Sequence, residues 1–278
     1  MAAKVHPCRY LPTAAALAVL SLVPEPAQAA PPQVADAPDW AFGEPAGEVV
    51  LAAASLSSLA LLALPKVETG WGPSWERPQD DGYGTASDFT GSFVGTTWQL
   101  VGGWALEGGY YQARGIADPH GRALRTTLID GEAVLLATGI SGALKRLTGR
   151  CRPRAWHDEQ CDADGQDGFP SGHVTPLAAL AGTRFVLAAQ SDGEAVRRQL
   201  AFGFAEGATL ATGVLRILAG AHSWEDVVAA WAIGHATGAL TALAHPVEPL
   251  PAEPPGTATG AGAQGGGWDV GLRWSGAF

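Results

Sequence analysis

The chain has 278 residues, a formal net charge of −10 and 47% hydrophobic residues. This acidic balance argues against nucleic acid as a partner, because a negative surface repels the phosphate backbone. The length suffices for one large domain with a sizeable core and flanking segments.

The N-terminus has the pattern of an export signal over residues 1–29. A short basic start, an apolar stretch over 11–23 and the small residues Ala27-Gln28-Ala29 follow one another in the order that a signal peptidase requires. Cleavage after Ala29 predicts an exported protein, either periplasmic or extracellular. A retained anchor is the alternative, although an apolar core of about 13 residues is short for a membrane span.

The remaining chain predicts an all-α fold, a bundle of about six helices. A disordered mature N-terminus is predicted over 30–47, and a Pro/Gly-rich linker with a short amphipathic tail over 246–278. Between them lies a helical domain over 48–245, with helices expected over 48–64, 88–114, 122–147, 173–190, 194–218 and 223–245. Nothing in this order alternates strands with helices, so no core sheet is expected.

The apolar runs are not expected to reach the roughly 20 residues of a membrane span, because Arg184, Glu206 and Arg216 interrupt them. We therefore expect a soluble or membrane-associated protein in preference to an integral membrane protein.

Two cysteines remain once Cys8 leaves with the export signal. Cys151 and Cys161 lie ten positions apart in a chain that is expected to reach an oxidising compartment, so they predict a disulfide. Two free thiols are the alternative. No metal-ligand spacing accompanies them, and no metal is predicted.

Five basic residues fall within positions 145–154 of this acidic chain. Lys145 and Arg152 are seven apart, about two helical turns, so both can project from one face of a helix that Pro153 ends. A lysine supplies a point charge and an arginine grips two phosphate oxygens, which favours a small anionic ligand. A solvated basic helix end is the alternative.

The segment Ser171-Gly172-His173 ends an acidic loop and begins an apolar helix. The first N–H groups of a helix have no intrahelical partner and carry partial positive charge, so this turn is suited to an anion. Gly172 allows close approach of the ligand, and His173 titrates near neutral pH. A turn that merely caps the helix would have the same sequence.

Arg216, His222 and Asp226 form a third group. His222 and Asp226 are four apart, so Asp226 can accept from one ring nitrogen and leave the other free as nucleophile or base. Each residue also has a plainer interpretation: Arg216 as a surface charge, His222 as a core histidine, and Asp226 as part of a capping box with Ser223.

In order, K-x6-R-P (145–153), P-S-G-H (170–173) and R-x5-H-x3-D (216–226) resemble the signature of the type 2 phosphatidic acid phosphatase and vanadium haloperoxidase superfamily, over roughly residues 85–245. The resemblance implies that the phosphoryl oxygens are bound by Lys145, Arg152, Ser171, Gly172 and Arg216. It also implies that His222 is the nucleophile, Asp226 its orienting partner and His173 the acid for the leaving oxygen. Leu215 departs from the family, which usually has Ser before this Arg, and is expected to alter a hydrogen bond near Arg216.

The resemblance implies a phosphoric ester hydrolase: a metal-independent phosphatase that hydrolyses phosphomonoesters through a phosphohistidine. Its partner would be a small phosphorylated substrate, with lipid phosphates at a membrane surface or polyprenyl diphosphates as candidates. No cofactor is expected, and vanadate would inhibit as a transition-state mimic. The alternatives are a vanadate-dependent haloperoxidase, for which the chain is short, and a catalytically silent anion-binding module.

Overall fold

The computed structural model describes residues 45–63, 65–67, 71–73, 80–157, 160–161, 165–190 and 195–245. The predicted export signal, nearly all of the segment predicted to be disordered, and the predicted tail over 246–278 lie outside the described residues.

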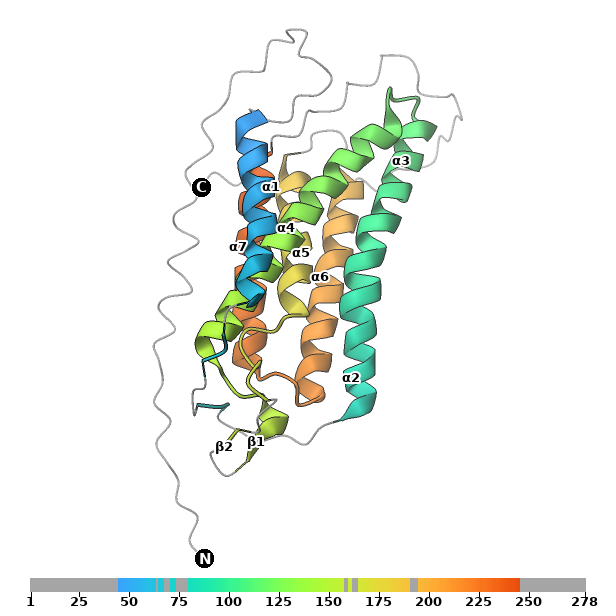
Figure 1. Cartoon of the computed structure of the whole chain (residues 1–278). Helices are drawn as coiled ribbons and strands as arrows, with labels where there is room; N and C mark the ends of the chain where they lie inside the picture. The colour runs from blue at the N-terminus through green and yellow to red at the C-terminus, as the bar shows by residue number, and fades with distance from the viewer. Residues whose placement is uncertain are drawn as a thin grey trace, which may run out of the picture. The chain divides into compact units, whose positions relative to one another are not determined.

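The described chain is all-α, as predicted (Figure 1). Its helices are α1 (Pro45–Ala60) with the short η3 (Leu61–Ala63), α2 (Asp81–Asp88), η4 (Phe89–Gly102), α3 (Gly103–Ala113), α4 (Pro119–Thr148), α5 (Val174–Ala189), α6 (Ala195–Leu218) and α7 (Trp224–Ala244). Because α2, η4 and α3 follow without a break, these elements form six helical rods across the described ranges. A single turn, η5 (Pro153–Ala155), precedes the two-residue strands β1 (Trp156–His157) and β2 (Gln160–Cys161), which pair antiparallel.

The rod formed by α2, η4 and α3 begins seven residues before its predicted start at Asp88. The side chain of Asp80 accepts a hydrogen bond from the backbone N–H of Tyr83 at 3.2 Å and so caps the new start. The middle of the rod, η4, has π-helical geometry. Consistent with this, the hydroxyl of Thr96 donates to the carbonyl five residues earlier. The first rod, α1, begins at Pro45, just inside the segment predicted to be disordered.

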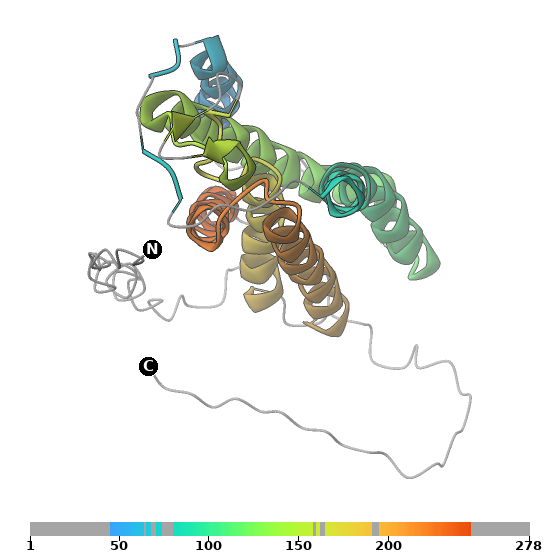
Figure 2. The same cartoon turned by 90° about the horizontal axis from the view of Figure 1, so that it is seen from below.

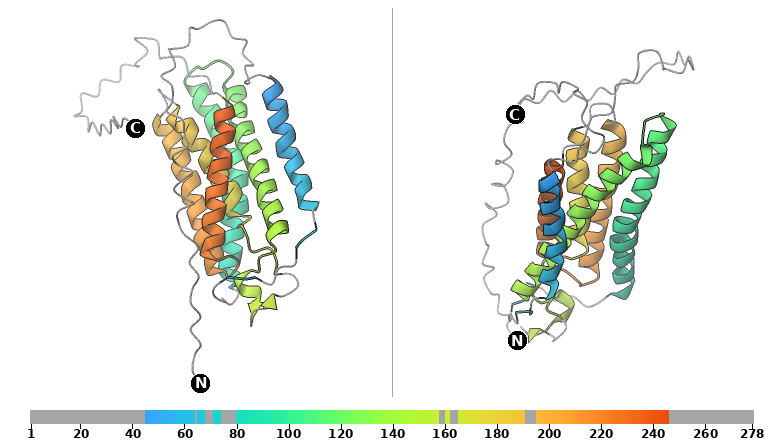
Figure 3. Two further views of the ribbon diagram at one scale, coloured as in Figure 1. Left: turned by 90° about the vertical axis from the view of Figure 1, so that its left-hand side faces the viewer. Right: turned by 45° about the horizontal axis from the view of Figure 1, so that its top comes forward.

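Helix α5 lies at the centre of the helical unit, where it packs against α4, α6 and α7 (Figure 2). Helix α1 runs along α4, as Figure 3 shows, whereas α2 and η4 pack against α6. The core therefore forms around a helix that directly follows the predicted anion-binding turn.

The contact between α5 and α7 is unusually close, because glycines line it. A Cβ atom at Gly238 would overlap the backbone carbonyl of Ala179, and one at Gly234 would overlap that of Thr175. From the opposite side, a Cβ at Gly182 would lie 2.5 Å from the carbonyl oxygen of His235. Small residues at such spacing let two helix backbones touch.

Successive helices from α4 to α7 alternate in direction, so the end of α4, the start of α5, the end of α6 and the start of α7 lie at one end of the unit. The β1–β2 hairpin lies at the same end, at the bottom of Figure 1. All three sequence motifs are carried to this end.

Three helical segments are long and apolar enough to cross a membrane: Pro119–Ala155, Val196–Leu218 and Trp224–Ala244. The expectation that no apolar run is long enough for a membrane span is therefore wrong: by length and composition, three segments are. Glu206 and Arg216 lie in one of these segments, which stays apolar enough on average despite them, whereas Arg184 lies in the shorter α5. Most residues of these segments are not buried within the helical unit, and large apolar side chains such as Leu147, Leu200 and Leu240 are each more than 60% exposed.

Candidate active site

The predicted site residues come from four elements that meet at one end of the unit. Lys145 lies in the last turn of α4, Ser171 to His173 precede α5, Arg216 lies in the last turn of α6, and His222 precedes α7. We refer to Lys145, Arg152 and Arg216 as the three site cations. Direct contacts join the three motifs: Lys145 donates to the carbonyl of Pro170, and the N–H of Ser171 donates to the carbonyl of Asp226 at 3.1 Å.

Lys145 is held by the loop that leads into α5. Its ammonium donates to the carbonyl oxygens of Asp167 and Pro170, both at 2.7 Å. An ammonium has three donors, so one remains for a ligand. A Cβ atom at Gly172 would lie 3.2 Å from Cε of Lys145, so a glycine there keeps the lysine beside the turn.

Several buried polar atoms at this end have no hydrogen-bond partner within the described ranges. Three belong to predicted phosphate-binding residues, namely the hydroxyl of Ser171, which is fully buried, and the Nε atoms of Arg152 and Arg216; the others lie on Arg150, Ser223 and Glu225. Buried polar atoms in native proteins are nearly always paired, so an unpaired group needs an explanation. Donors gathered from three separate motifs fit an anion such as phosphate.

His222 is almost fully buried, and the carbonyl of Gly168 orients it. The ring Nδ1 lies 2.7 Å from this carbonyl oxygen. Because a carbonyl only accepts hydrogen bonds, Nδ1 must carry the proton and Nε2 keeps its lone pair. The site therefore presents the tautomer that a nucleophile or base requires.

Asp226 does not make the hydrogen bond to His222 that the four-residue spacing suggested. Its Oδ2 lies 3.8 Å from Nδ1, which is beyond hydrogen-bonding distance, and accepts instead from the backbone N–H of Ser223 at 2.8 Å. Its Oδ1 accepts from Nη1 of Arg150 at 2.7 Å. Asp226 therefore stabilises the start of α7, and its negative charge reaches His222 without direct contact.

Arg150 belongs to the basic cluster but was not predicted as a site residue. Its side chain is buried against Asp226, and its carbonyl accepts from the N–H of Gly168 at 2.7 Å. Arg150 thus supports both groups next to Nδ1 of His222. Only the basic cluster could have suggested it, because no motif spacing links position 150 to position 226.

We expect Arg150→Met to lower the free energy of unfolding by roughly 3 kcal/mol, because it leaves the carboxylate of Asp226 buried without its cation. Thermal unfolding of the purified protein measures the loss. The double variant Arg150→Met/Asp226→Asn removes that charge and should regain part of the stability. Equal stability of Arg150→Met and the unaltered protein would contradict the structural role of this pair.

Arg216 has partners on α2. Its Nη1 donates to the hydroxyl of Ser87 at 3.2 Å and to Oδ1 of Asp88 at 2.8 Å. With Leu215 in the place where the family usually has a serine, Ser87 supplies a hydroxyl to this arginine from another helix. The same Oδ1 of Asp88 lies 3.2 Å from Nε2 of His173. Neither Ser87 nor Asp88 stands out in the sequence.

Both histidines are biased toward the neutral form. Burial and the charges of the three site cations, Arg216 foremost, lower the pKa of His173 to about 4, while Asp88 opposes the shift. Burial and the same cations, Lys145 foremost, hold the pKa of His222 well below its ordinary value of 6.5. An anion bound among the cations would offset their charge and favour the protonated form again.

Cys151 and Cys161 are joined by a disulfide, with their Cα atoms 5.7 Å apart. The bond ties β2 to the segment between Arg150 and Arg152. In the part of the chain that the structure describes, no group of three or more His, Cys, Asp or Glu side chains could hold a metal ion.

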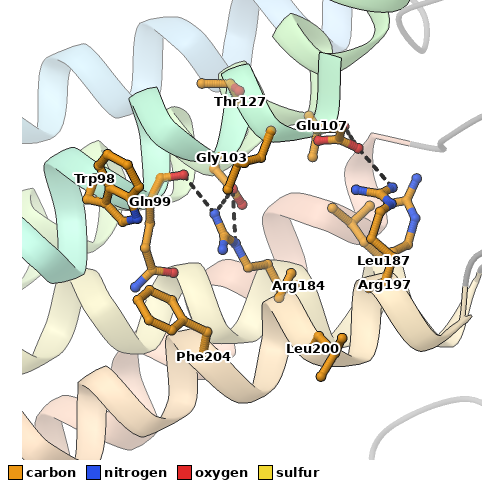
Figure 4. A pocket seen from close by; sticks show the side chains of 15 residues that line it. Trp98, Gln99, Gly103, Glu107, Thr127, Arg184, Leu187, Arg197, Leu200 and Phe204 are labelled. Atoms are coloured by element: carbon orange, nitrogen blue, oxygen red, sulfur yellow. Dashed lines mark hydrogen bonds and ion pairs between the residues drawn. The ribbon is translucent and has the colours of Figure 1, made fainter. Parts of the chain in front are cut away.

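A cavity of about 420 Å³ lies elsewhere, between η4, α3, α4, α5 and α6 (Figure 4). Its lining includes the buried ion pair Arg184–Asp130 and the half-buried ion pair Arg197–Glu107, but none of the predicted site residues. Phe204 in its wall is twelve residues before Arg216 on α6, which corresponds to roughly 18 Å along the helix. The cavity is separate from the predicted site.

Comparisons with known proteins give one sequence match and one structural likeness. Residues 127–248 match the sequence model of the PAP2 superfamily. No curated protein sequence matches the chain. A solved structure, described as the first transmembrane PAP2 type phosphatidylglycerolphosphate phosphatase from Bacillus subtilis, aligns with 69% of this chain and 84% of its own at 16% identity and a TM-score of 0.40.

Proposed function

We propose that this chain, whose residues 127–248 match the sequence model of the PAP2 superfamily, is a metal-independent phosphatase that hydrolyses phosphomonoesters through a phosphohistidine intermediate. The observation that carries the proposal is the set of buried, unpaired donors on Ser171, Arg152 and Arg216. They lie in the three motifs that also supply the two histidines. A phosphoryl group would satisfy these donors and neutralise the three site cations.

In the proposed reaction, Nε2 of His222 attacks phosphorus while the bond from phosphorus to the leaving oxygen breaks. His173, protonated when the anion is bound, gives its Nε2 proton to that oxygen, so an alcohol departs. Water then attacks the phosphohistidine and passes a proton to His173. The nitrogen–phosphorus bond breaks, orthophosphate leaves, and both histidines return to their starting states.

The three site cations supply the electrostatic part of catalysis. Charge in the transition state of phosphoryl transfer is spread over the equatorial oxygens, and fixed cations in a partly buried site stabilise it. The fixed tautomer of His222 adds positioning, because its lone pair needs no rearrangement before attack. These residues provide the positive charge that a metal ion provides in other phosphatases.

We also propose that the enzyme is embedded in a membrane and acts on lipid phosphates. Three helical segments long enough for a span support this, as do the exposed apolar side chains of the outer helix faces. The site lies at one end of those helices, where a lipid headgroup would meet it. We further propose that residues 1–29 are a cleaved export signal; they lie outside the residues that the structure describes.

The test is phosphate release from a lipid phosphomonoester in detergent micelles and from a generic aryl phosphate, each with a strong chelator present. We expect activity that resists the chelator and falls when vanadate is added. Activity that disappears with the chelator would contradict a metal-independent reaction. Vanadate-dependent bromide oxidation in place of phosphate release would instead identify a haloperoxidase, and phosphate binding without either activity would identify an anion-binding module.

The low pKa of His173 predicts how the rate depends on pH. In the free enzyme His173 loses its proton as the pH rises through about 4, so kcat/KM should decline over that range. The bound phosphoryl group raises the pKa of His173 again, so kcat should decline only at higher pH. Measuring kcat/KM and kcat against pH with an aryl phosphate tests whether kcat/KM declines at the lower pH. A kcat/KM that stays level to pH 7 would mean that another group donates the proton.

A further inference from the structure

Asp88 bridges two groups of the site, although it belongs to none of the sequence motifs. A single oxygen, Oδ1, lies 2.8 Å from Nη1 of Arg216 and 3.2 Å from Nε2 of His173. The Arg216 side chain is buried, whereas 60% of the Asp88 side chain is exposed. The carboxylate therefore lies at the solvent-facing side of the site, next to the histidine that would protonate the leaving oxygen.

The surrounding contacts hold the backbone of Asp88 in this place. The fully buried hydroxyl of Ser87 donates to the carbonyl of Gly84 at 2.7 Å and accepts from Arg216. Two residues after Asp88, the hydroxyl of Thr90 accepts a hydrogen bond from the hydroxyl of Thr212 on α6 at 3.1 Å. The position of this carboxylate is thus set by buried neighbours on both sides.

Gly91 brings the same rod close to His173. A Cβ atom at position 91 would lie 3.1 Å from the His173 ring and 3.3 Å from the Thr212 side chain. A larger residue would push the rod away from α5 and α6, and Asp88 with it. The close approach of the rod therefore keeps a negative charge beside the proton donor.

A fixed negative charge on this side favours some leaving groups over others. In a phosphomonoester the group next to His173 is the oxygen of an uncharged alcohol. In a diphosphate it is a second, anionic phosphate, which the carboxylate of Asp88 would repel at a separation of a few ångströms. The three site cations, by contrast, attract the transferred phosphoryl group of either substrate.

We propose that Asp88 is a specificity-determining residue that directs the enzyme to lipid phosphomonoesters and against lipid diphosphates. The proposal rests on the proposed function, because it assumes that His173 faces the leaving group. It narrows the substrate class to one of the two that the motifs alone leave open.

Farnesyl phosphate and farnesyl diphosphate form a matched pair, because they share one apolar chain and differ only in the second phosphate. We expect the unaltered enzyme to have a higher kcat/KM for the monophosphate. Asp88→Asn should reduce the ratio of the two values about tenfold, mainly by raising kcat/KM for the diphosphate. Asp81→Asn, an exposed residue on the same helix, removes the same charge and should leave the ratio unchanged.

Three outcomes would overturn the proposal. If Asp88→Asn changes neither value of kcat/KM, the carboxylate does not discriminate. If it raises kcat/KM equally for both substrates, the carboxylate only competes with the phosphoryl group for Arg216. A diphosphate preferred by the unaltered enzyme would equally reverse the assignment.

A binding measurement separates this proposal from the proposed function. Titration calorimetry with orthophosphate and with methylenediphosphonate, which is not hydrolysed, needs no turnover. Asp88→Asn should improve the affinity for the diphosphonate about tenfold more than that for orthophosphate. If neither farnesyl compound is hydrolysed but this difference is found, the phosphatase proposal fails and the role of Asp88 in selecting anions stands. Equal changes for both anions would overturn the role of Asp88 even in an active enzyme.

Discussion

His222→Ala should abolish phosphate release, with a loss in kcat of roughly 10⁴-fold or more, as expected when a covalent nucleophile is removed. The ring is almost fully buried, and the carbonyl of Gly168 lies 2.7 Å from Nδ1 and so fixes the direction of Nε2. An alanine has no nucleophilic atom in that position. Phosphate release from a lipid phosphomonoester measures the effect.

A second readout identifies the intermediate. Brief mixing of enzyme with a ³²P-labelled substrate, followed by denaturation, should leave an acid-labile label on the unaltered protein and none on His222→Ala. His235→Ala is the matched control, because His235 lies on α7, which His222 directly precedes, but pairs with Glu206 away from the site. It should keep both activity and label. An active, labelled His222→Ala enzyme would contradict the proposed mechanism.

Gly238→Ala should cause the largest loss of stability that a single methyl group can produce in this fold. The added Cβ would overlap the backbone carbonyl of Ala179, and a backbone cannot move aside as a side chain can. Helices α5 and α7 would have to separate, so we expect a loss of roughly 3 kcal/mol or more in the free energy of unfolding. Activity should fall too, because His173 directly precedes α5 and His222 precedes α7.

Gly207→Ala is the control for this prediction. Gly207 is an exposed glycine on α6, and a Cβ there would meet nothing within 4 Å. Because alanine is the better helix former, this change should be neutral or raise stability by about 0.5–1 kcal/mol. Thermal unfolding in detergent compares the two variants. Similar melting temperatures for both would show that the α5–α7 contact is looser than the structure indicates.

The six helical rods could be predicted because apolar periodicity, glycine and proline mark them along the chain. Their ends were less predictable. The rod that carries Asp88 begins seven residues early because Asp80 caps it, and the glycine-rich stretch around position 82 concealed that start. The sequence also does not predict a membrane span in α6, because Glu206 and Arg216 interrupt its apolar residues. The segment Val196–Leu218 is nevertheless long and apolar enough to cross a membrane.

The residues of the candidate site also divide into those that the sequence predicts and those that only the structure reveals. Spacing alone suggested Lys145, Arg152, His173 and His222, since each lies in a short motif. It also suggested that Asp226 bonds to His222, but four-residue spacing only places two side chains on one face of a helix, and His222 precedes α7 rather than lying within it. Gly168, which contacts His222, and Arg150, which contacts Asp226 and Gly168, could not be assigned these roles from motif spacing.

The sequence by itself determined the kind of chemistry available, because cations, two histidines and a helix start are properties of residue type and short-range spacing. It also determined the all-α class, because periodicity is local. The tertiary structure decided which groups touch: Gly168 fixes the tautomer of His222, Arg150 holds Asp226, and Asp88 reaches the site from a distant rod. Such contacts depend on how helices pack, and close backbone approaches like that at Gly238 set the packing. Residues more than a hundred positions apart are brought within hydrogen-bonding distance only when the whole unit has folded.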